Sequence, residues 1–216
     1  IDVPQLKVVS SVLRTQPLAG GPEVSASGHG FAFRKRLDGG YTVAHGGVIN
    51  FDLVPDSLRL LSRFLPLAWM ARHELRPRLS SRFGIEWREP KSWSLDELSP
   101  FEKIRILDPA PLPGVLRAAV RNLKGAYPAF QGLQVAEEWA GMIDVTPDAV
   151  PVISGTPDLP GLVLATGFSG HGFGIGPAAG QLAADLVTAA PTAIDLQPFA
   201  LSRFFDGSKI CPVAGI

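Results

Sequence analysis

The sequence is poor in the features that mark several large classes of protein. It contains a single cysteine, Cys211, so no internal disulfide can form, which suits a reducing, cytoplasmic location and equally an exported protein without disulfides. Its 20 basic residues balance 20 acidic ones, so no net charge attracts nucleic acid or an anionic membrane. No His/Cys cluster has metal-ligand spacing, and no nucleophile-elbow motif indicates a hydrolase. We therefore expect a cytoplasmic protein with no nucleic-acid partner and no metal.

One long stretch, 159–184, contains no Asp, Glu, Lys or Arg and is long enough to cross a bilayer. Glycines recur through it, and Pro160, Pro177 and Gln181 interrupt it, so a spanning helix would be both broken and polar. The N-terminus has no basic flank followed by an apolar segment, which is the pattern of a signal peptide. The sequence therefore predicts no membrane span.

Alternating apolar residues predict a sheet. Residues 6–15 are rich in β-branched side chains, and Phe31 and Phe33 alternate with smaller or polar residues before an Asp38-Gly39-Gly40 turn. That segment reads as a hairpin whose return strand ends at His45. Further strands are expected at 133–145, 150–153 and 162–166.

Helical spacing of apolar residues predicts several helices between and after these strands. One is expected after Pro55 with a break at Pro66, because proline lacks the N–H that continues a helix. Ser99 to Glu102 matches a capping box, and residues 115–123 predict another helix. A last helix is expected from Pro177.

A glycine repeat lies between the last strand and the last helix. Gly170, Gly172, Gly174 and Gly176 occupy every second position. The spacing does not match the dinucleotide-binding G-x-G-x-x-G, because Ile175 or Pro177 falls at the third glycine. Glycines let a ligand approach the backbone closely, and a helix N-terminus attracts negative charge. From spacing alone, a ligand-binding loop and a turn that allows tight helix packing both remain open.

Two motifs together resemble a known family. They are WAGMIDVTPDAVPVIS, residues 139–154, and LPGLVLATGFSGHGFGIGPAAGQLAADLV, residues 159–187. Both are similar to the C-terminal half of the D-amino-acid oxidase, glycine oxidase and sarcosine oxidase superfamily of FAD-dependent amine oxidoreductases. The resemblance implies an α/β fold: a substrate domain with a mixed or antiparallel sheet in residues 1–140, and a segment 141–190 that completes a Rossmann-like FAD domain. Residues 191–216 would form a C-terminal tail.

The same resemblance implies a partner that is missing from this sequence. The family's G-x-G-x-x-G lies in an N-terminal half, so we expect that half as a separate chain or a cleaved fragment. The absence of an initiator Met before Ile1 favours cleavage. The implied reaction is hydride transfer to flavin N5 from the carbon beside the amine of a small amino acid or secondary amine. Water then hydrolyses the resulting imine.

Site residues are carried over from the family by position. The backbone of 170–174 would lie against the pyrimidine edge of the flavin, near the start of the last helix. The cofactor-binding residues implied in this way are Gly141, Met142, Ser169, Gly170, His171, Gly172, Phe173, Gly174 and Ile175.

This sequence departs from the family pattern at three positions. Ile143 stands where relatives have a carboxylate-binding Arg or Tyr, and Gly174 where monomeric sarcosine oxidases have a carboxylate-binding Lys. Both are expected to line the substrate pocket without a charge. Gly141 replaces the Cys that attaches FAD covalently in those oxidases, so FAD is expected to bind noncovalently. His45 either faces the substrate as a catalytic residue or is satisfied by backbone near Gly46.

The missing carboxylate ligands also leave a second hypothesis. A chain that kept the fold but lost these ligands would serve as a noncatalytic binding or assembly subunit. Ile143 and Gly174 motivate that alternative as much as they motivate an altered substrate.

Overall fold

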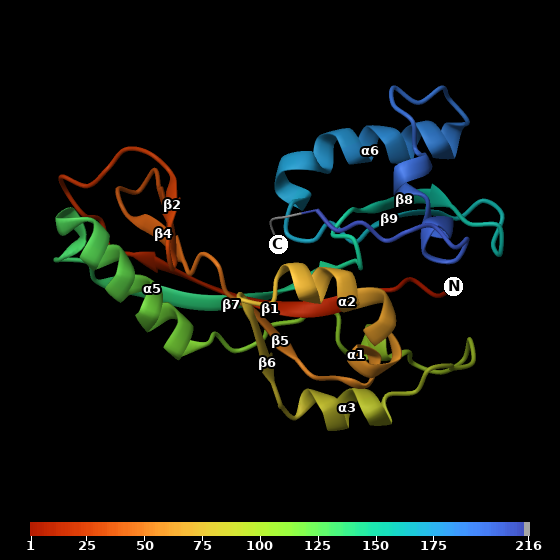
Figure 1. The fold of residues 1–216 in the computed structure, drawn as a ribbon, viewed down its shortest axis with the longest axis horizontal. Helices are drawn as coiled ribbons and strands as arrows, with labels where there is room; N and C mark the ends of the chain where they lie inside the picture. The colour runs from red at the N-terminus through yellow and green to blue at the C-terminus, as the bar shows by residue number, and fades with distance from the viewer. Residues whose placement is uncertain (214–216) are drawn as a thin grey trace.

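The computed structural model describes residues 1–213 and contains a mixed seven-stranded sheet and a separate two-stranded sheet (Figure 1). The strands of the large sheet are β1 (Leu6–Thr15), β2 (Ala26–Gly28), β3 (Phe31–Lys35), β4 (Tyr41–Ala44), β5 (Ile49–Asp52), β6 (Leu75–Arg78) and β7 (Val135–Val145). The small sheet pairs β8 (Val152–Gly155) with β9 (Val163–Thr166). Every pairing is antiparallel except that of β5 with β6. The mixed α/β fold expected from the sequence is confirmed.

Strand β1 is the centre of the large sheet. Along one edge β7 pairs with it over its whole length, from Leu6 opposite Val145 to Thr15 opposite Val135. The other edge is shared, because β4 pairs with 12–14 and β5 pairs with 8–9. Between these two pairings, β4 and β5 diverge beside Ser10 and Ser11. We call this gap in the sheet the fork.

Helices cover both faces of the large sheet unevenly. They are α1 (Pro55–Arg59), α2 (Leu61–Met70), α3 (Arg82–Arg88), α4 (Pro100–Lys103), α5 (Pro113–Ala126) and α6 (Gly172–Thr188), with 3-10 turns η1 (Pro128–Phe130), η2 (Gln197–Phe199) and η3 (Leu201–Phe204). Helix α5 packs on the face that carries Leu13, and α2 packs on the opposite face, which carries Val8. We call these the α5 face and the α2 face. None of the helices within residues 1–213 is long and apolar enough to span a membrane.

An aromatic cluster fills the space between the hairpin and α5. Tyr41 and Phe130 are completely buried, with ring centroids 4.7 Å apart, and Phe33 lies 5.1 Å from Phe130. The ring of Tyr127 meets Phe33 edge-on. Aromatic pairs at these separations add to the stabilisation from burial itself, so this half of the molecule has a core of its own.

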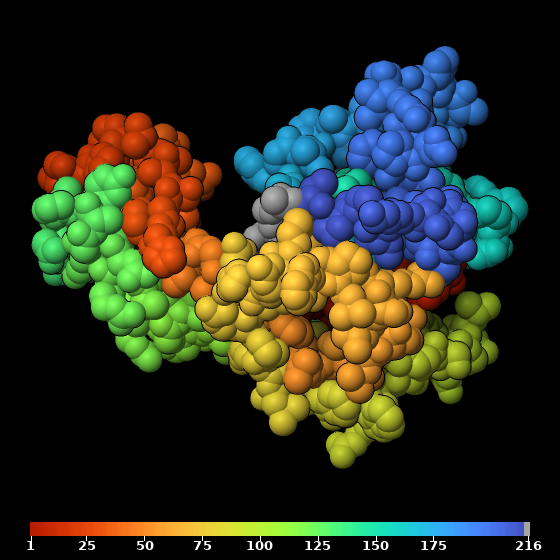
Figure 2. Space-filling view, viewed as in Figure 1, coloured from red at the N-terminus to blue at the C-terminus, as the bar shows by residue number. Residues whose placement is uncertain are grey.

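The α2 face is open over its other half. Trp139 of β7 is 37% exposed there, beside Val12 of β1, which is only half-buried. Figure 2 shows a wide notch between the lobe of β2–β4 and helix α6. Part of the sheet, the lobe and the start of α6 therefore border one open space.

The two-stranded sheet packs between α6 and η3. Ile153 of β8 joins Ala179 and Leu182 of α6 on one side, and Val152 joins Phe204 of η3 on the other. The expected tail, 191–216, extends beyond the described residues, but its described part packs back onto β8. Within residues 1–213, the outer edges of β8 and β9 pair with no other strand.

Two expected helix boundaries are wrong, and both involve proline. Helix α6 begins at Gly172 and passes through Pro177, and α2 passes through Pro66, with the break instead at Leu60. Each proline removes one hydrogen bond to the carbonyl four residues earlier, which belongs to Phe173 or Ser62. Both of those residues are exposed, so water can satisfy the carbonyl and the helix continues.

Candidate functional site

The glycine loop, residues 167–171, turns the chain sharply from β9 into α6. Gly167 and Gly170 have φ of 73° and 86°, a conformation that side chains disfavour, and Ser169 shares it with φ of 50°. A Cβ at Gly170 would lie 3.8 Å from Cδ1 of Ile143 on β7. The loop backbone therefore lies next to the residue expected to line the substrate pocket, with room there for a Cβ in van der Waals contact.

Asp144 holds the beginning of this loop in place. Its Oδ2 accepts hydrogen bonds from the N–H of Gly167 at 2.6 Å, from Nε2 of Gln5 at 3.2 Å and from Oγ1 of Thr166 at 3.3 Å. Its backbone carbonyl accepts from the N–H of Ser169 at 3.0 Å. The carboxylate is thus committed to the loop, where hydrogen bonds to a charged acceptor are strong.

Ser169 is turned into the protein. It is completely buried, its Oγ accepts from the N–H of Thr146 at 3.4 Å, and it donates to the carbonyl of Gly167 at 3.2 Å. Its side chain shapes the loop from within and presents no group to the notch.

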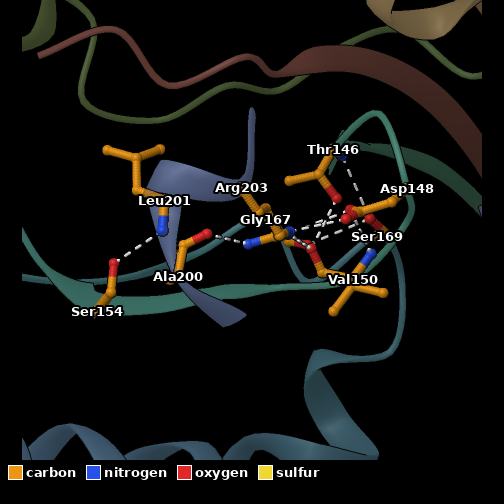
Figure 3. Close-up of polar contacts among 9 residues, drawn as sticks. All are labelled: Thr146, Asp148, Val150, Ser154, Gly167, Ser169, Ala200, Leu201 and Arg203. Carbon is orange, nitrogen blue, oxygen red and sulfur yellow. Dashed lines mark hydrogen bonds and ion pairs between the residues drawn. The ribbon is translucent and has the colours of Figure 1, made fainter. Parts of the chain in front are cut away.

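A largely buried ion pair ties η3 to the turn that follows β7 (Figure 3). Nε of Arg203 lies 2.7 Å from Oδ2 of Asp148, and Nη2 donates to Oδ1 at 3.1 Å and to the carbonyl of Val150 at 2.7 Å. Nearby, the N–H of Leu201 donates to Oγ of Ser154 at 3.1 Å. This bidentate arrangement fixes the position of η3, and with it β8 and α6, relative to the large sheet.

The first turn of α6 is exposed to solvent beside the glycine loop. Phe173 is 98% exposed, Ile175 is 39% exposed, and a Cβ at Gly174 or Gly176 would meet nothing within 4 Å. The N–H groups of Gly172 and Phe173 have no acceptor among residues 1–213. Free N–H groups and the positive end of the helix dipole suit a ligand oxygen or a negative charge. This turn can therefore hold the edge of a flavin ring.

A pocket of about 170 Å³ opens at the fork. We call it the fork pocket, and the residues that line it include His45, Ile143 and Asn50. His45 and Ile143, two residues expected separately at the site, both line this pocket. Ile143 also lies next to Gly170 of the loop, so it adjoins both the loop and the fork pocket.

His45 lies just beyond the end of β4 and is half-buried. Burial lowers the pKa of its imidazole below the ordinary value of 6.5, and repulsion from His29 and Arg76 lowers it further, while the adjacent Gly46 backbone raises it in part. Its Nδ1 is buried and has no hydrogen-bond partner in the described part of the chain. The imidazole is therefore neutral near pH 7, with one nitrogen unpaired.

Other expected site residues lie apart from this pocket. Because side chains alternate along a strand, Met142 projects from the α5 face, where it lines a separate pocket of about 540 Å³ with Lys7 and Asp52. Gly141 pairs with Ser10 in the middle of the sheet. Gly174, grouped with Ile143 from the sequence, lies on the surface of α6 and does not line the fork pocket.

Sequence reasoning missed Asn50 and Ser10, which are among the residues that line the fork pocket. The signal for Asn50 was an amide between Ile49 and Phe51, inside an otherwise apolar strand. No pattern in the sequence indicates that β4 and β5 part beside Ser10. In residues 1–213, no group of three His, Cys, Asp or Glu side chains is arranged to hold a metal ion.

Comparison with known proteins places this geometry among flavoproteins. The family model described as "FAD dependent oxidoreductase" matches residues 2–186. The solved structure of L-amino acid deaminase from Proteus myxofaciens in complex with anthranilate is 34% identical, with a TM-score of 0.89, and the match covers 94% of this chain and 45% of the deaminase.

Two curated relatives match shorter segments. A D-amino acid dehydrogenase from Paramagnetospirillum magneticum is 36% identical over 97 residues, which are 45% of this chain and 23% of the dehydrogenase. A glycine oxidase from Pseudomonas putida is 32% identical over 93 residues, 43% of this chain and 26% of the oxidase. The matches thus span less than half of each relative's own length.

Proposed function

We infer that this chain, which belongs to the FAD-dependent oxidoreductase family, forms the substrate side of a flavoenzyme that oxidises the C–N bond of a small amino acid or secondary amine. One observation carries the inference: Gly170 of the glycine loop lies next to Ile143, and both Ile143 and His45 are among the residues that line the fork pocket. A flavin held at the loop would therefore adjoin the fork pocket.

FAD, when bound, supplies the acceptor for the two electrons removed from the substrate. The residues of this chain that would hold its ring are the backbone of 170–174 and the first turn of α6. The free N–H groups of Gly172 and Phe173 favour negative charge on the ring edge, and they are fixed in place before reaction. Gly141 offers no side chain for a covalent link, which supports noncovalent binding.

The chain's own role in the reaction is to orient the substrate and exclude water. His45 is neutral and Ile143 is apolar, so the lining described so far presents no strong acid or base. Placing the C–H bond correctly beside the acceptor is itself a large part of catalysis in such a reaction. This division of labour is consistent with the lack of a charged side chain at position 143.

The nucleotide-binding half would come from outside residues 1–213. The outer edge of β9 pairs with no strand among these residues, and a sheet of two strands is only marginally stable alone. We propose that an N-terminal half carrying the adenosine site covers this edge and the exposed first turn of α6. The division into 1–140, 141–190 and 191–216 also stays a prediction, since β7 runs continuously through residue 140.

Amino acids are the substrate class that the relatives' names support. These names are D-amino acid dehydrogenase, glycine oxidase and L-amino acid deaminase, and each describes that relative alone. They agree on amino acids, but one names the D form, one the L form and one glycine, whose α-carbon has no configuration. We therefore propose an amino acid or a closely related secondary amine.

The test compares two glycines in the intact protein. Gly170 and Gly207 both have φ of 86°, but only Gly170 lies in the loop. Gly170→Ala and Gly207→Ala should each lose about 1–2 kcal/mol of stability from the same backbone strain. Only Gly170→Ala should lower the flavin content, measured from the visible spectrum, and slow anaerobic bleaching by an amino acid. Equal flavin content and bleaching rates in the two variants would contradict the proposed site.

The noncatalytic alternative keeps one specific support, the apolar Ile143 in the pocket. In that case, the intact protein would bind flavin, but no member of a panel of D- and L-amino acids and N-methyl amines would bleach it. Bleaching by any of them at a rate that saturates with concentration excludes the alternative.

A further inference from the structure

We propose that the outer side of helix α2 binds the surface of a lipid bilayer that carries anionic headgroups. The contact is made by Leu61, Leu65 and Trp69, which we call the α2 stripe, together with Arg72 just beyond the end of the helix. The helix would lie along the bilayer surface and would not cross it. None of the residues placed at the flavin site takes part in this contact.

Helix α2 is apolar on two sides. Phe64 and Leu67 are buried against β1 and β7, which is the usual role of the apolar side of a helix. Leu61, Leu65 and Trp69 recur every fourth residue, so they form a second row along the helix. They are 52%, 55% and 73% exposed, and in Figure 2 the light orange residues of α1 and α2 lie on the face toward the viewer. A single exposed apolar residue is ordinary, whereas a row of them indicates a binding surface.

The charge around the α2 stripe is positive. Residues 57–73 include Arg59, Arg63 and Arg72 but no Asp or Glu, and the next carboxylate is that of Glu74. Arg59 is neutralised by two aspartates, at 2.9 Å and 3.0 Å. Neither Arg63 nor Arg72 forms an ion pair with any residue in 1–213. The net charge of zero therefore conceals a local cationic surface, which an anionic surface complements.

Trp69 and Arg72 form a pair suited to the boundary between hydrocarbon and water. Cζ of Arg72 lies 5.0 Å from the centre of the Trp69 ring, and Nη1 of Arg72 donates to the Trp69 carbonyl at 2.9 Å. Both side chains are exposed. Tryptophan is enriched at the headgroup level of membranes, and arginine there keeps its charge in water while its stem covers apolar surface. The pair therefore supplies an interfacial anchor and a cation for a lipid phosphate.

An apolar pocket of about 200 Å³ lies between α1, α2 and the large sheet. Leu61 belongs both to the α2 stripe and to the lining of this pocket, and Leu58 of α1, which is 65% exposed, also lines it. The lining is apolar except for Lys7, Asp52 and Ser57. An apolar cavity takes hydrocarbon more readily than water. The surroundings of the α2 stripe therefore suit the acyl chains of a bilayer.

A bilayer fits these features better than a second copy of this chain does. Two copies that met through the α2 stripe would bring one Arg72 toward the other, with no carboxylate in residues 57–73 to neutralise either. Like charges brought together across an interface disfavour the contact. Anionic headgroups, in contrast, attract the arginine while hydrocarbon receives the leucines, and both terms strengthen the binding of an amphipathic helix.

The first test is co-sedimentation of the intact protein with vesicles of phosphatidylcholine, alone or mixed with phosphatidylglycerol. The mixed vesicles should bind the protein, and Leu65→Ser should weaken this binding by about tenfold, because a leucine no longer enters hydrocarbon. The matched control is Leu37→Ser, which replaces a fully exposed leucine in the hairpin turn and should leave binding unchanged. No binding to the mixed vesicles, or equal effects of the two variants, would overturn the proposal.

The second test examines the charge. Binding to the mixed vesicles should exceed binding to phosphatidylcholine alone and should weaken at high salt. Arg72→Gln should lower it by about fivefold, the effect of removing one cation near an anionic surface. Its control, Arg121→Gln, removes an exposed arginine of α5 that has no ion pair within residues 1–213. Equal binding to both kinds of vesicle would exclude recognition of anionic headgroups.

The third test locates the contact with vesicles that contain brominated acyl chains, which quench the fluorescence of tryptophans that reach hydrocarbon. Trp69 and Trp87 are 73% and 69% exposed, so each serves as the control for the other. Quenching should be lost in Trp69→Phe and retained in Trp87→Phe. The reverse result would place the contact on α3 and overturn the assignment to α2.

Sedimentation velocity without vesicles tests the competing occupant. The intact protein and its Leu65→Ser variant should have the same oligomeric state. A dimer that Leu65→Ser dissociates would assign the α2 stripe to a contact between two copies, and the bilayer proposal would then be wrong.

Discussion

The aromatic cluster beneath α5 and the unit formed by β8, β9 and α6 are built in opposite ways. In the cluster, Tyr41 and Phe130 are completely buried by the hairpin, η1 and α5. In the second unit, Phe173 is 98% exposed and Val187 is 69% exposed, and the outer edge of β9 is unpaired within residues 1–213. The first region is stabilised by its own contacts. The second presents surface, which is what a site shared with another half of a protein requires.

The largest expected effect on the free energy of unfolding comes from removing a buried ring of the aromatic cluster. Phe130→Ala removes a completely buried ring and should lower the free energy of unfolding by about 4 kcal/mol. The control, Phe173→Ala in the open unit, should change it by less than about 0.5 kcal/mol. Urea denaturation followed by circular dichroism measures both. Similar losses for the two variants would remove the contrast between the regions.

The next effect concerns the ion pair that joins the open unit to the large sheet. Arg203→Met leaves Asp148 buried without its partner and should lower the free energy of unfolding by about 3 kcal/mol. Adding Asp148→Asn to that variant should restore part of the loss, because no buried charge remains. Thermal unfolding of the two variants gives the comparison. A single variant as stable as the double one would show that the pair contributes little.

Two glycines of the same segment should respond with opposite signs. Gly167 has φ of 73°, and an added Cβ would collide with Thr146, so Gly167→Ala should cost about 2 kcal/mol. Gly174 is helical and has open space around it, so Gly174→Ala should stabilise the protein by up to about 1 kcal/mol. Chemical denaturation of both variants provides the measurement. Destabilisation by Gly174→Ala would contradict the open space found around this glycine.

The smallest expected effect is a pH dependence of the folding stability that comes from His45 at the fork pocket. The folded-state pKa of His45 lies below its ordinary value of 6.5, so the unfolded chain binds the proton more readily. Stability is therefore expected to fall as the pH drops through 6.5 toward the folded-state pKa. His45→Gln should flatten this decline relative to the unchanged protein, in melting temperatures measured from pH 8 to pH 5. Identical slopes in the two proteins would contradict the assignment.

Much of the large sheet could be anticipated, because its strands carry local signals. The strand 6–15 and the hairpin ending at His45 were both predicted, and the capping box at Ser99 is present. Proline was an unreliable indicator of helix boundaries. Pro66 and Pro177 were expected to mark helix boundaries, but both lie inside helices because the carbonyls they leave free face solvent.

The site was predictable only in part. Resemblance pointed to Ile143 and Gly170, which lie next to each other in the structure. It also pointed to Ser169 and Met142 as cofactor ligands, and that role remains a prediction: Ser169 is buried beneath the loop, and Met142 projects from the other face of the sheet. Asn50 was missed because its position beside the fork pocket depends on a gap in strand pairing, and no local sequence pattern encodes that gap.

The amino-acid sequence by itself indicated the long strands, several of the helices and the family that the two long motifs resemble, since periodicity and motif spacing are properties of neighbouring residues. The tertiary structure alone decided that β4 and β5 part beside Ser10, that helices continue through Pro66 and Pro177, and that Ile143 lies next to both the fork pocket and the glycine loop. These are contacts between segments far apart in the chain. Their geometry is set by how the whole sheet pairs and packs.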